Sequence, residues 1–298
     1  MLGWRVGLSA VLIPAFIGIF WLDHRAGESA PYLLGLCVLL AVRGTWEFSK
    51  LLHVRSFEPS FPALALGASI VVAAGWIGHA SFLPLSESDH PAVSLAAMSV
   101  CFSLVVLLLF LRSAISYREP GRSMETLGAE VLGVSYLGLL LAMTTQLRWV
   151  AGADAGYFVL GSLVIAAKSG DIGAYTLGRL FGQRKMIPRL SPGKTWMGFW
   201  GALLGAALGA WLWLTFAPGL FGNNVKPAPA GWAILYGVIV GLVGLIGDLC
   251  ESLIKRDVGQ KDSAPLFPGF GGLLDLLDSV LYAGPVAYVL WLVLPLSG

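Results

Sequence analysis

The sequence has few charged residues, and this scarcity excludes most classes of soluble protein. Only 12% of the 298 residues are Asp, Glu, Lys or Arg, whereas soluble domains carry about 25%. Hydrophobic residues make up 57% of the chain, and no long linker or low-complexity tract interrupts them. This balance predicts a protein that is embedded in lipid over most of its length.

Two further classes are excluded by what is missing. The formal net charge of +2 is too small to predict a nucleic-acid partner. The three cysteines, Cys37, Cys101 and Cys250, lie far apart in apolar surroundings and form no CxxC pair. We therefore expect inert buried thiols rather than a disulfide framework or a thiolate metal site.

Long apolar runs recur along the chain, each close to the roughly 20 residues that span a bilayer as a helix. They predict an all-α, polytopic integral membrane protein with about nine transmembrane helices. The predicted spans are 4–22, 31–49, 61–79, 92–111, 125–146, 157–178, 196–216, 231–253 and 273–295. We expect residues 1–150 to form a transmembrane scaffold with possible lipid access, and residues 151–298 to form the catalytic region.

The distribution of basic residues predicts the orientation of these spans. With a cytoplasmic N-terminus, 15 of the 19 Lys and Arg residues fall on the inner side, where such residues are enriched. Only Arg25, Arg148 and Lys226 fall outside, and Lys168 lies within a span. The motif-rich loops 179–195 and 254–272 then both face the cytoplasm, so a site built from them would open on that side of the inner membrane.

A stripe of small residues predicts close helix packing. In "GALLGAALG", Gly201, Gly205 and Gly209 are four residues apart, and Gly237 and Gly241 repeat the spacing. Such spacing lets helix backbones approach closely. The partner is either another helix of the same chain or a second copy in a homodimer.

Acidic residues gather in the apolar spans of the second half, where a charge at mid-bilayer costs about 2.5–3.5 kcal/mol. Asp171 lies in span six, Asp248 at the end of span eight, and Asp275 and Asp278 at the start of span nine. Asp275 and Asp278 are three residues apart and share a helix face, which suits a bound Mg²⁺. The alternative is a pair of acids solvated at a helix end.

Glu251 and Lys255 are four residues apart, and we expect a simple helix salt bridge worth well under 1 kcal/mol. The loops nearby carry cations. "LSPGKTWMG" places Lys194 in a turn that suits a phosphate but lacks the P-loop spacing. "SLIKRDVGQKDSAPLFPGFGG" adds Lys255, Arg256 and Lys261, and its glycines would let backbone amides approach a ligand. Metal-binding acids beside such cations are typical of a polyphosphate site.

The stretch "SLIKRDVGQKDSAPLFPGFGGLLDLLD" resembles the signature of the phosphatidate cytidylyltransferase (CDP-diacylglycerol synthase) family. That signature reads S-x-x-K-R-x4-K-D, then Pro-Gly-His-Gly-Gly, then D-R-x-D. The segments "DIGAYTLGRLFG", "SPGKTWMGF" and "GDLCES" extend the resemblance over roughly 165–298. Phe270 stands where the family usually has His, Leu276 where it has Arg, and Met197 where a polar residue is common.

The resemblance implies that CTP and phosphatidic acid react to give CDP-diacylglycerol and pyrophosphate in the membrane. It implies Mg²⁺ bound by Asp248 and Asp275, with Asp278 and Asp171 close behind, and allows a second cation. The residues expected to contact phosphates or substrate are Lys255, Arg256, Lys261, Ser191, Lys194, Thr195, Ser252, Asp262, Gly271 and Gly272. A transporter, or another lipid-linked nucleotidyl or phosphoryl transferase, is the alternative, because both also use intramembrane acids.

Overall fold

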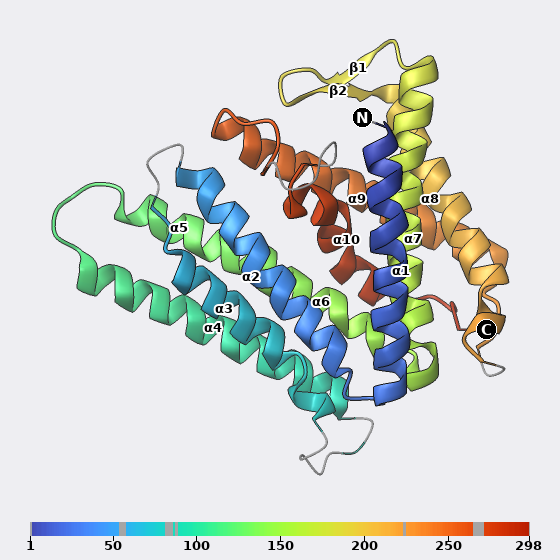
Figure 1. The fold of residues 1–298 in the computed structure, drawn as a ribbon, viewed down its shortest axis with the longest axis horizontal. Helices are drawn as coiled ribbons and strands as arrows, with labels where there is room; N and C mark the ends of the chain where they lie inside the picture. Colours follow the sequence, from blue (N-terminus) through green and yellow to red (C-terminus); the bar gives the residue numbers. More distant parts are fainter. Residues whose placement is uncertain are drawn as a thin grey trace. The chain divides into compact units, whose positions relative to one another are not determined.

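The computed structural model describes residues 2–53, 58–80, 86, 89–222, 225–264 and 271–297 (Figure 1). The chain is 79% helical, which confirms the predicted all-α class. The α-helices are α1 (Leu2–Ala26), α2 (Pro31–His53), α3 (Phe61–Ala74), α4 (His90–Ser116), α5 (Ser123–Val134), α6 (Leu140–Thr145), α7 (Gly152–Phe181), α8 (Trp196–Phe216), α9 (Ala230–Asp257) and α10 (Leu273–Val293).

Seven helical stretches of the described residues are long and apolar enough to cross a membrane. Six of them correspond to α2, α4, α7, α8, α9 and α10, and the seventh, Ser123–Arg148, runs through α5 and α6. The apolar helix α3 is shorter than this limit. The membrane-protein class is therefore confirmed, whereas the exact number of nine crossings and the cytoplasmic N-terminus stay predictions.

The chain divides into two compact units. The first contains Met1–Ala142 together with Val258–Leu276, and the second contains Met143–Asp257 together with Leu277–Gly298. The described residues 258–264 and 271–276, which lie before and in the first turn of α10, thus belong with the N-terminal helices. The rest of α10 contacts α7 and α9.

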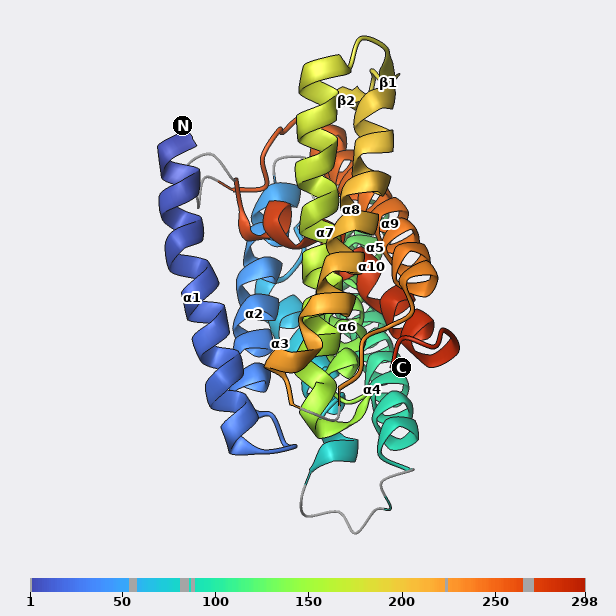
Figure 2. The same ribbon diagram turned by 90° about the vertical axis from the view of Figure 1, so that its right-hand side faces the viewer.

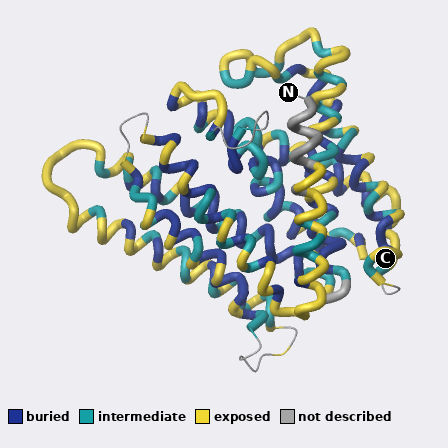
Figure 3. The backbone as a smooth tube through the Cα atoms, viewed as in Figure 1, coloured by how far each residue is buried: buried dark blue, intermediate teal, exposed yellow. Residues whose placement is uncertain are grey.

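In the first unit, α2, α3 and the part of the helical stretch Ser123–Arg148 that belongs to this unit pack around fully buried side chains. Phe48, Leu64 and Leu137 have at most 1% of their surface exposed. The long helix α4 is different, because only 22% of its most apolar window is buried and exposed residues follow its length (Figure 3). An apolar helix with so much exposed surface is typical of one that faces lipid.

In the second unit, α7 and α8 run alongside each other (Figure 1 and Figure 2). The glycine stripe lies at this contact: a Cβ added at Gly201 would overlap the carbonyl oxygen of Gly173, and one at Gly205 would overlap that of Ser169. At Gly237 of α9, an added Cβ would lie 2.7 Å from the Cα of Ala207. The stripe therefore serves packing within the chain.

A small antiparallel sheet, β1 (Lys185–Ile187) with β2 (Ser191–Thr195), connects α7 to α8. Lys185 pairs with Thr195 and Ile187 with Ser191. The sequence predicted a loop here, and the Pro-Gly pair of "SPGKT" did not indicate a strand. Thr195 ends the hairpin and begins α8, because its Oγ1 accepts a hydrogen bond from the Gly198 amide at 3.1 Å.

We expect Gly201→Ala to destabilise the protein, because the new methyl group overlaps a backbone atom that cannot rotate away. Overpacking of this kind costs about 1–3 kcal/mol. The matched control is Gly128→Ala, since a Cβ at Gly128 has no heavy atom within 4 Å. Thermal unfolding in detergent should show a lower midpoint for the first variant only. Equal midpoints would contradict the close packing of α7 and α8.

Candidate active site

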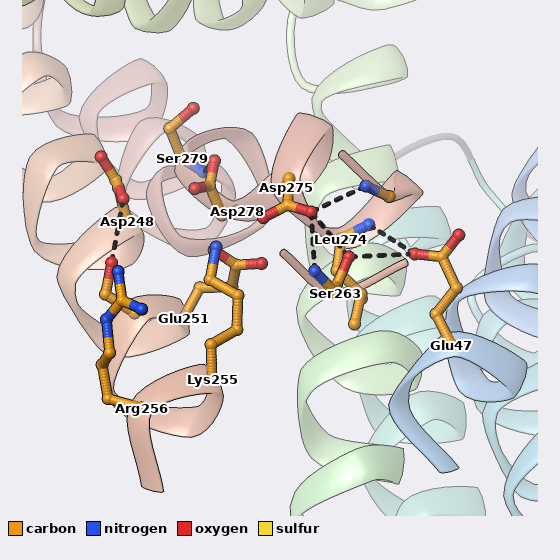
Figure 4. Close-up of polar contacts among 12 residues, drawn as sticks. Glu47, Asp248, Glu251, Lys255, Arg256, Ser263, Leu274, Asp275, Asp278 and Ser279 are labelled. Carbon is orange, nitrogen blue, oxygen red and sulfur yellow. Dashed lines mark hydrogen bonds and ion pairs between the residues drawn. The ribbon is translucent and has the colours of Figure 1, made fainter. Parts of the chain in front are cut away.

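Three carboxylates converge in the second unit, on α9 and α10 (Figure 4). Asp248 and Glu251 are three residues apart on α9 and share a face, and Asp278 joins them from α10. Ligand oxygens from the three residues all lie within 4.8 Å of one another. Glu251 and Asp278 are only 2% and 6% exposed, so water screens their charges weakly.

Glycine at position 247 allows the two helices to come this close. A Cβ on Gly247 would lie 2.8 Å from the carbonyl oxygen of Asp278 and 2.5 Å from the Cβ of Tyr282. Any larger residue would push α9 and α10 apart directly beside Asp248. The "GD" pair of "GDLCES" thus places a close helix contact directly beside a candidate metal ligand.

Two lysines balance part of the negative charge. Lys194 Nζ lies 2.9 Å from Asp248 Oδ2, and Lys255 forms an ion pair with Glu251. The predicted pairing of Glu251 with Lys255 is confirmed. Both residues are buried, whereas the expected contribution of well under 1 kcal/mol applies to an exposed pair. Removing one partner of a buried ion pair costs about 3–5 kcal/mol, far more than breaking a surface salt bridge.

The hairpin brings Lys194 to the acids. Lys194 also donates to the carbonyl of Leu245 at 3.5 Å, and Arg256 Nε donates to the carbonyl of Leu190 at 3.3 Å. These contacts bring the hairpin against the C-terminal half of α9. Of the predicted trio in "SPGKT", Lys194 reaches an acid, Thr195 caps α8, and Ser191 is half-buried at the start of β2.

A second polar group lies beside Asp278. Lys168 Nζ is 2.9 Å from Asp171 Oδ2 and donates to Ser279 Oγ at 3.1 Å. The Ser279 hydroxyl also lies 3.3 Å from Asp171 Oδ2. Ser279 follows Asp278 in the chain, so this group extends the polar region from α10 to α7. On α9, the Ser252 hydroxyl lies 3.5 Å from Asp248 Oδ1, one helical turn away on the same face.

Asp275 belongs to the first unit, where it occupies the first turn of α10 (Figure 4). Its Oδ2 accepts hydrogen bonds from the Ser263 amide at 3.0 Å, the Ser263 hydroxyl at 2.8 Å and the Gly272 amide at 2.7 Å. These donors hold the carboxylate in one orientation. One of these donors is the Gly272 amide, which we had expected to bind a ligand.

The glycine turn before Asp275 has a conformation that other residues rarely adopt. Gly271 has φ +90°, and a Cβ there would overlap the Asp275 carboxylate. Lys261 and Asp262 are exposed at the start of the same loop. Phe270, the departure from the family signature in this turn, lies outside the described residues.

Two site residues were missed by the sequence analysis. Glu251 was interpreted only as a salt-bridge partner, although its spacing of three from Asp248 places both on one face. Glu47 of α2 accepts hydrogen bonds from Ser263 and Leu274. No local pattern in α2 indicated contacts with residues more than 200 positions away.

The three-carboxylate cluster fits a magnesium ion. Its donors are all carboxylate oxygens, which Mg²⁺ prefers, and they come from rigid helices rather than loops. Three acids with two lysines leave a net negative charge, so a divalent cation would be attracted to them. Asp248 and Asp278 were predicted as ligands, and Glu251 adds a third acid.

The family model described as "Cytidylyltransferase family" matches residues 4–294. The chain belongs to the cytidylyltransferase family. The phosphatidate cytidylyltransferase of Pseudomonas aeruginosa is 33% identical over 98% of this chain and 97% of its own length.

Other phosphatidate cytidylyltransferases are also similar. That of Haemophilus influenzae is 32% identical over 77% of this chain and 89% of its own. That of Mycobacterium leprae is 43% identical over 45% of this chain and 40% of its own. Membership of the cytidylyltransferase family confirms the resemblance and extends it to the N-terminal half, which the motifs did not cover.

We expect Lys255→Met to destabilise the cytidylyltransferase fold by about 3–5 kcal/mol, because Glu251 would keep a buried charge without this partner. Added Mg²⁺ should restore part of the loss, since it supplies positive charge to the same acids. Lys185→Met is the control, because Lys185 is exposed on β1. Thermal unfolding with and without Mg²⁺ measures both effects. A midpoint for Lys255→Met equal to that of the control would contradict the buried pair.

Proposed function

We propose that this member of the cytidylyltransferase family transfers the cytidylyl group of CTP to the phosphate of phosphatidic acid. The products are CDP-diacylglycerol and pyrophosphate. The observation that carries this proposal is the three-carboxylate cluster flanked by Lys194 and Lys255, in segments that carry the family signature. A transporter is not favoured, because the family and its named relatives catalyse group transfer.

The reaction needs alignment of two anions rather than a protein nucleophile. An oxygen of the phosphatidate phosphate attacks the α-phosphorus of CTP, and the bond from that phosphorus to the bridging oxygen breaks. The electron pair leaves with pyrophosphate. Because both reactants are anions, the protein contributes mainly by positioning them and compensating their charge.

Each part of the site has a role in this scheme. Asp248, Glu251 and Asp278 would hold Mg²⁺, which when bound neutralises charge on phosphate oxygens. Asp275 stays a predicted Mg²⁺ ligand, and a site for a second cation also stays a prediction. Lys194, Arg256 and Lys261 would bind the triphosphate or the leaving pyrophosphate, with Lys255 balancing Glu251.

We also propose nine spans in the inner membrane, a cytoplasmic N-terminus and a site that faces the cytoplasm. CTP would arrive from the water and phosphatidate from the leaflet. Support comes from the basic residues and from the contact between Arg256 and Leu190, which keeps the hairpin and the end of α9 together. A homodimer stays a proposal without support from the glycine stripe, which is used within the chain.

The purified protein should release pyrophosphate only when CTP, phosphatidate and Mg²⁺ are all present. Asp248→Asn should lower turnover about 10²–10³-fold, because one key electrostatic stabiliser is lost. Asp278→Asn should lower turnover by a similar factor. The loss of turnover in the double variant should be much smaller than the product of the two single losses, because both acids would hold one ion. Glu119→Gln, an exposed loop acid, is the control. Equal product formation in excess chelator would refute the metal proposal.

Single cysteines introduced at Lys185, Lys226 and Lys261 test the proposed orientation. An impermeant maleimide should label positions 185 and 261 from the cytoplasmic side and position 226 from the opposite side. Labelling is measured in inverted and right-side-out vesicles, in a background without the three native cysteines. Cytoplasmic labelling of position 226 would rule out the nine-span arrangement.

A further inference from the structure

A buried carboxylate of the N-terminal half reaches the segment that carries Asp275. Glu47 lies in α2 with no exposed surface. Its Oε1 is 2.9 Å from Arg43 Nη2, and its Oε2 accepts hydrogen bonds from the Leu274 amide at 3.2 Å and the Ser263 hydroxyl at 3.3 Å (Figure 4). All of these residues belong to the first unit.

The contact with Leu274 suits an anion. Leu274 is the second residue of α10, and the first amides of a helix have no acceptor within the helix. They also carry the positive end of the helix dipole, which favours a carboxylate. Glu47 therefore stabilises the start of α10 from outside, in addition to Asp275, whose side chain binds the Gly272 amide from within the same turn.

Ser263 connects the two carboxylates. Its hydroxyl lies 2.8 Å from Asp275 Oδ2 and 3.3 Å from Glu47 Oε2, and its amide donates to Asp275 as well. The space between them is filled, because a Cβ on Gly272 would overlap both the Ser263 hydroxyl and Glu47 Oε2. Glu47, Ser263, Gly272 and Asp275 are thus packed as one group, which we name the α10 cradle.

Burying a carboxylate such as Glu47 costs free energy, so we expect the groups that it contacts to depend on it. Taking a carboxylate out of water costs several kcal/mol, and well-packed apolar residues often replace buried ion pairs without loss of stability. A contribution to stability alone is therefore a poor explanation for a buried glutamate at position 47. Its partners, in contrast, are the loop and helix turn that set the orientation of Asp275.

We infer that Glu47 is a positioning residue for the transfer reaction: through the Leu274 amide and Ser263, it holds the first turn of α10 and the orientation of Asp275. This inference rests on the proposed function for its kinetic consequence, but the structural link from Glu47 to α10 stands independently. The N-terminal helices thereby contribute to the catalytic region instead of serving only as a scaffold.

The test compares Glu47→Ala with Glu130→Ala, a matched control in the same unit. Glu130 is also a buried acid, 2% exposed, with one arginine partner, Arg112, and one backbone donor, Ser60. Both variants should lower the unfolding midpoint. Only Glu47→Ala should lower kcat per folded molecule, by about 10–100-fold, and raise the Mg²⁺ concentration for half-maximal rate, as loss of supporting contacts does at metal sites.

Glu47→Gln should recover part of the rate, because its amide oxygen can still accept from Leu274. Glu47→Ala, but not Glu130→Ala, should speed hydrogen exchange of the 271–277 backbone. The inference is overturned if exchange there is unchanged, whatever the activity, or if both alanine variants keep the same kcat and Mg²⁺ dependence. If the wild-type protein makes no pyrophosphate, the proposed function fails, and the exchange experiment alone decides the role of Glu47.

Discussion

The cost of keeping carboxylates in apolar helices dominates the chemistry of this protein. An acid near the middle of a bilayer costs a few kcal/mol unless a cation, a hydrogen-bond donor or water compensates it. The structure provides two forms of compensation. In the second unit, Asp248 and Glu251 have lysine partners. In the first unit, Glu47 and Asp275 accept hydrogen bonds from amides at the start of α10.

These two forms have different chemical consequences. Lysines compensate charge incompletely where three acids converge, so the cluster of Asp248, Glu251 and Asp278 keeps an attraction for a divalent cation. Backbone amides belong to the fold itself and do not dissociate. The amides around Asp275 therefore fix the orientation of that carboxylate, whereas the three-acid cluster would provide the site for a divalent cation. A nucleotidyl transfer that relies on positioning and charge compensation requires both.

The sequence predicted the parts of this arrangement that depend on local patterns. Hydropathy indicated the helices, and helical spacing predicted the ion pair of Glu251 with Lys255. The sequence did not predict contacts between residues that are far apart in the chain, or contacts that depend on backbone conformation. Glu47 meets Leu274 across 227 residues, and the burial that strengthens the pair of Glu251 with Lys255 comes from tertiary packing. The hairpin after α7 carries a Pro-Gly pair, which local propensity assigns to a turn.

The alternation of acidic and basic side chains in this site suits the phosphate-bearing substrates of the proposed reaction. Acids alone would repel CTP and phosphatidate, and lysines alone would hold pyrophosphate too firmly to release it. With Lys194 beside Asp248, each charge lowers the cost of the other in a poorly solvated site. Under the proposed function, Lys194 would bind a phosphate oxygen, and Asp248 would help to hold a divalent cation that neutralises charge on phosphates. On this proposal, the ion pairs of Lys194 with Asp248 and of Lys255 with Glu251 are how the protein keeps both signs of charge within apolar helices until substrate and metal are bound.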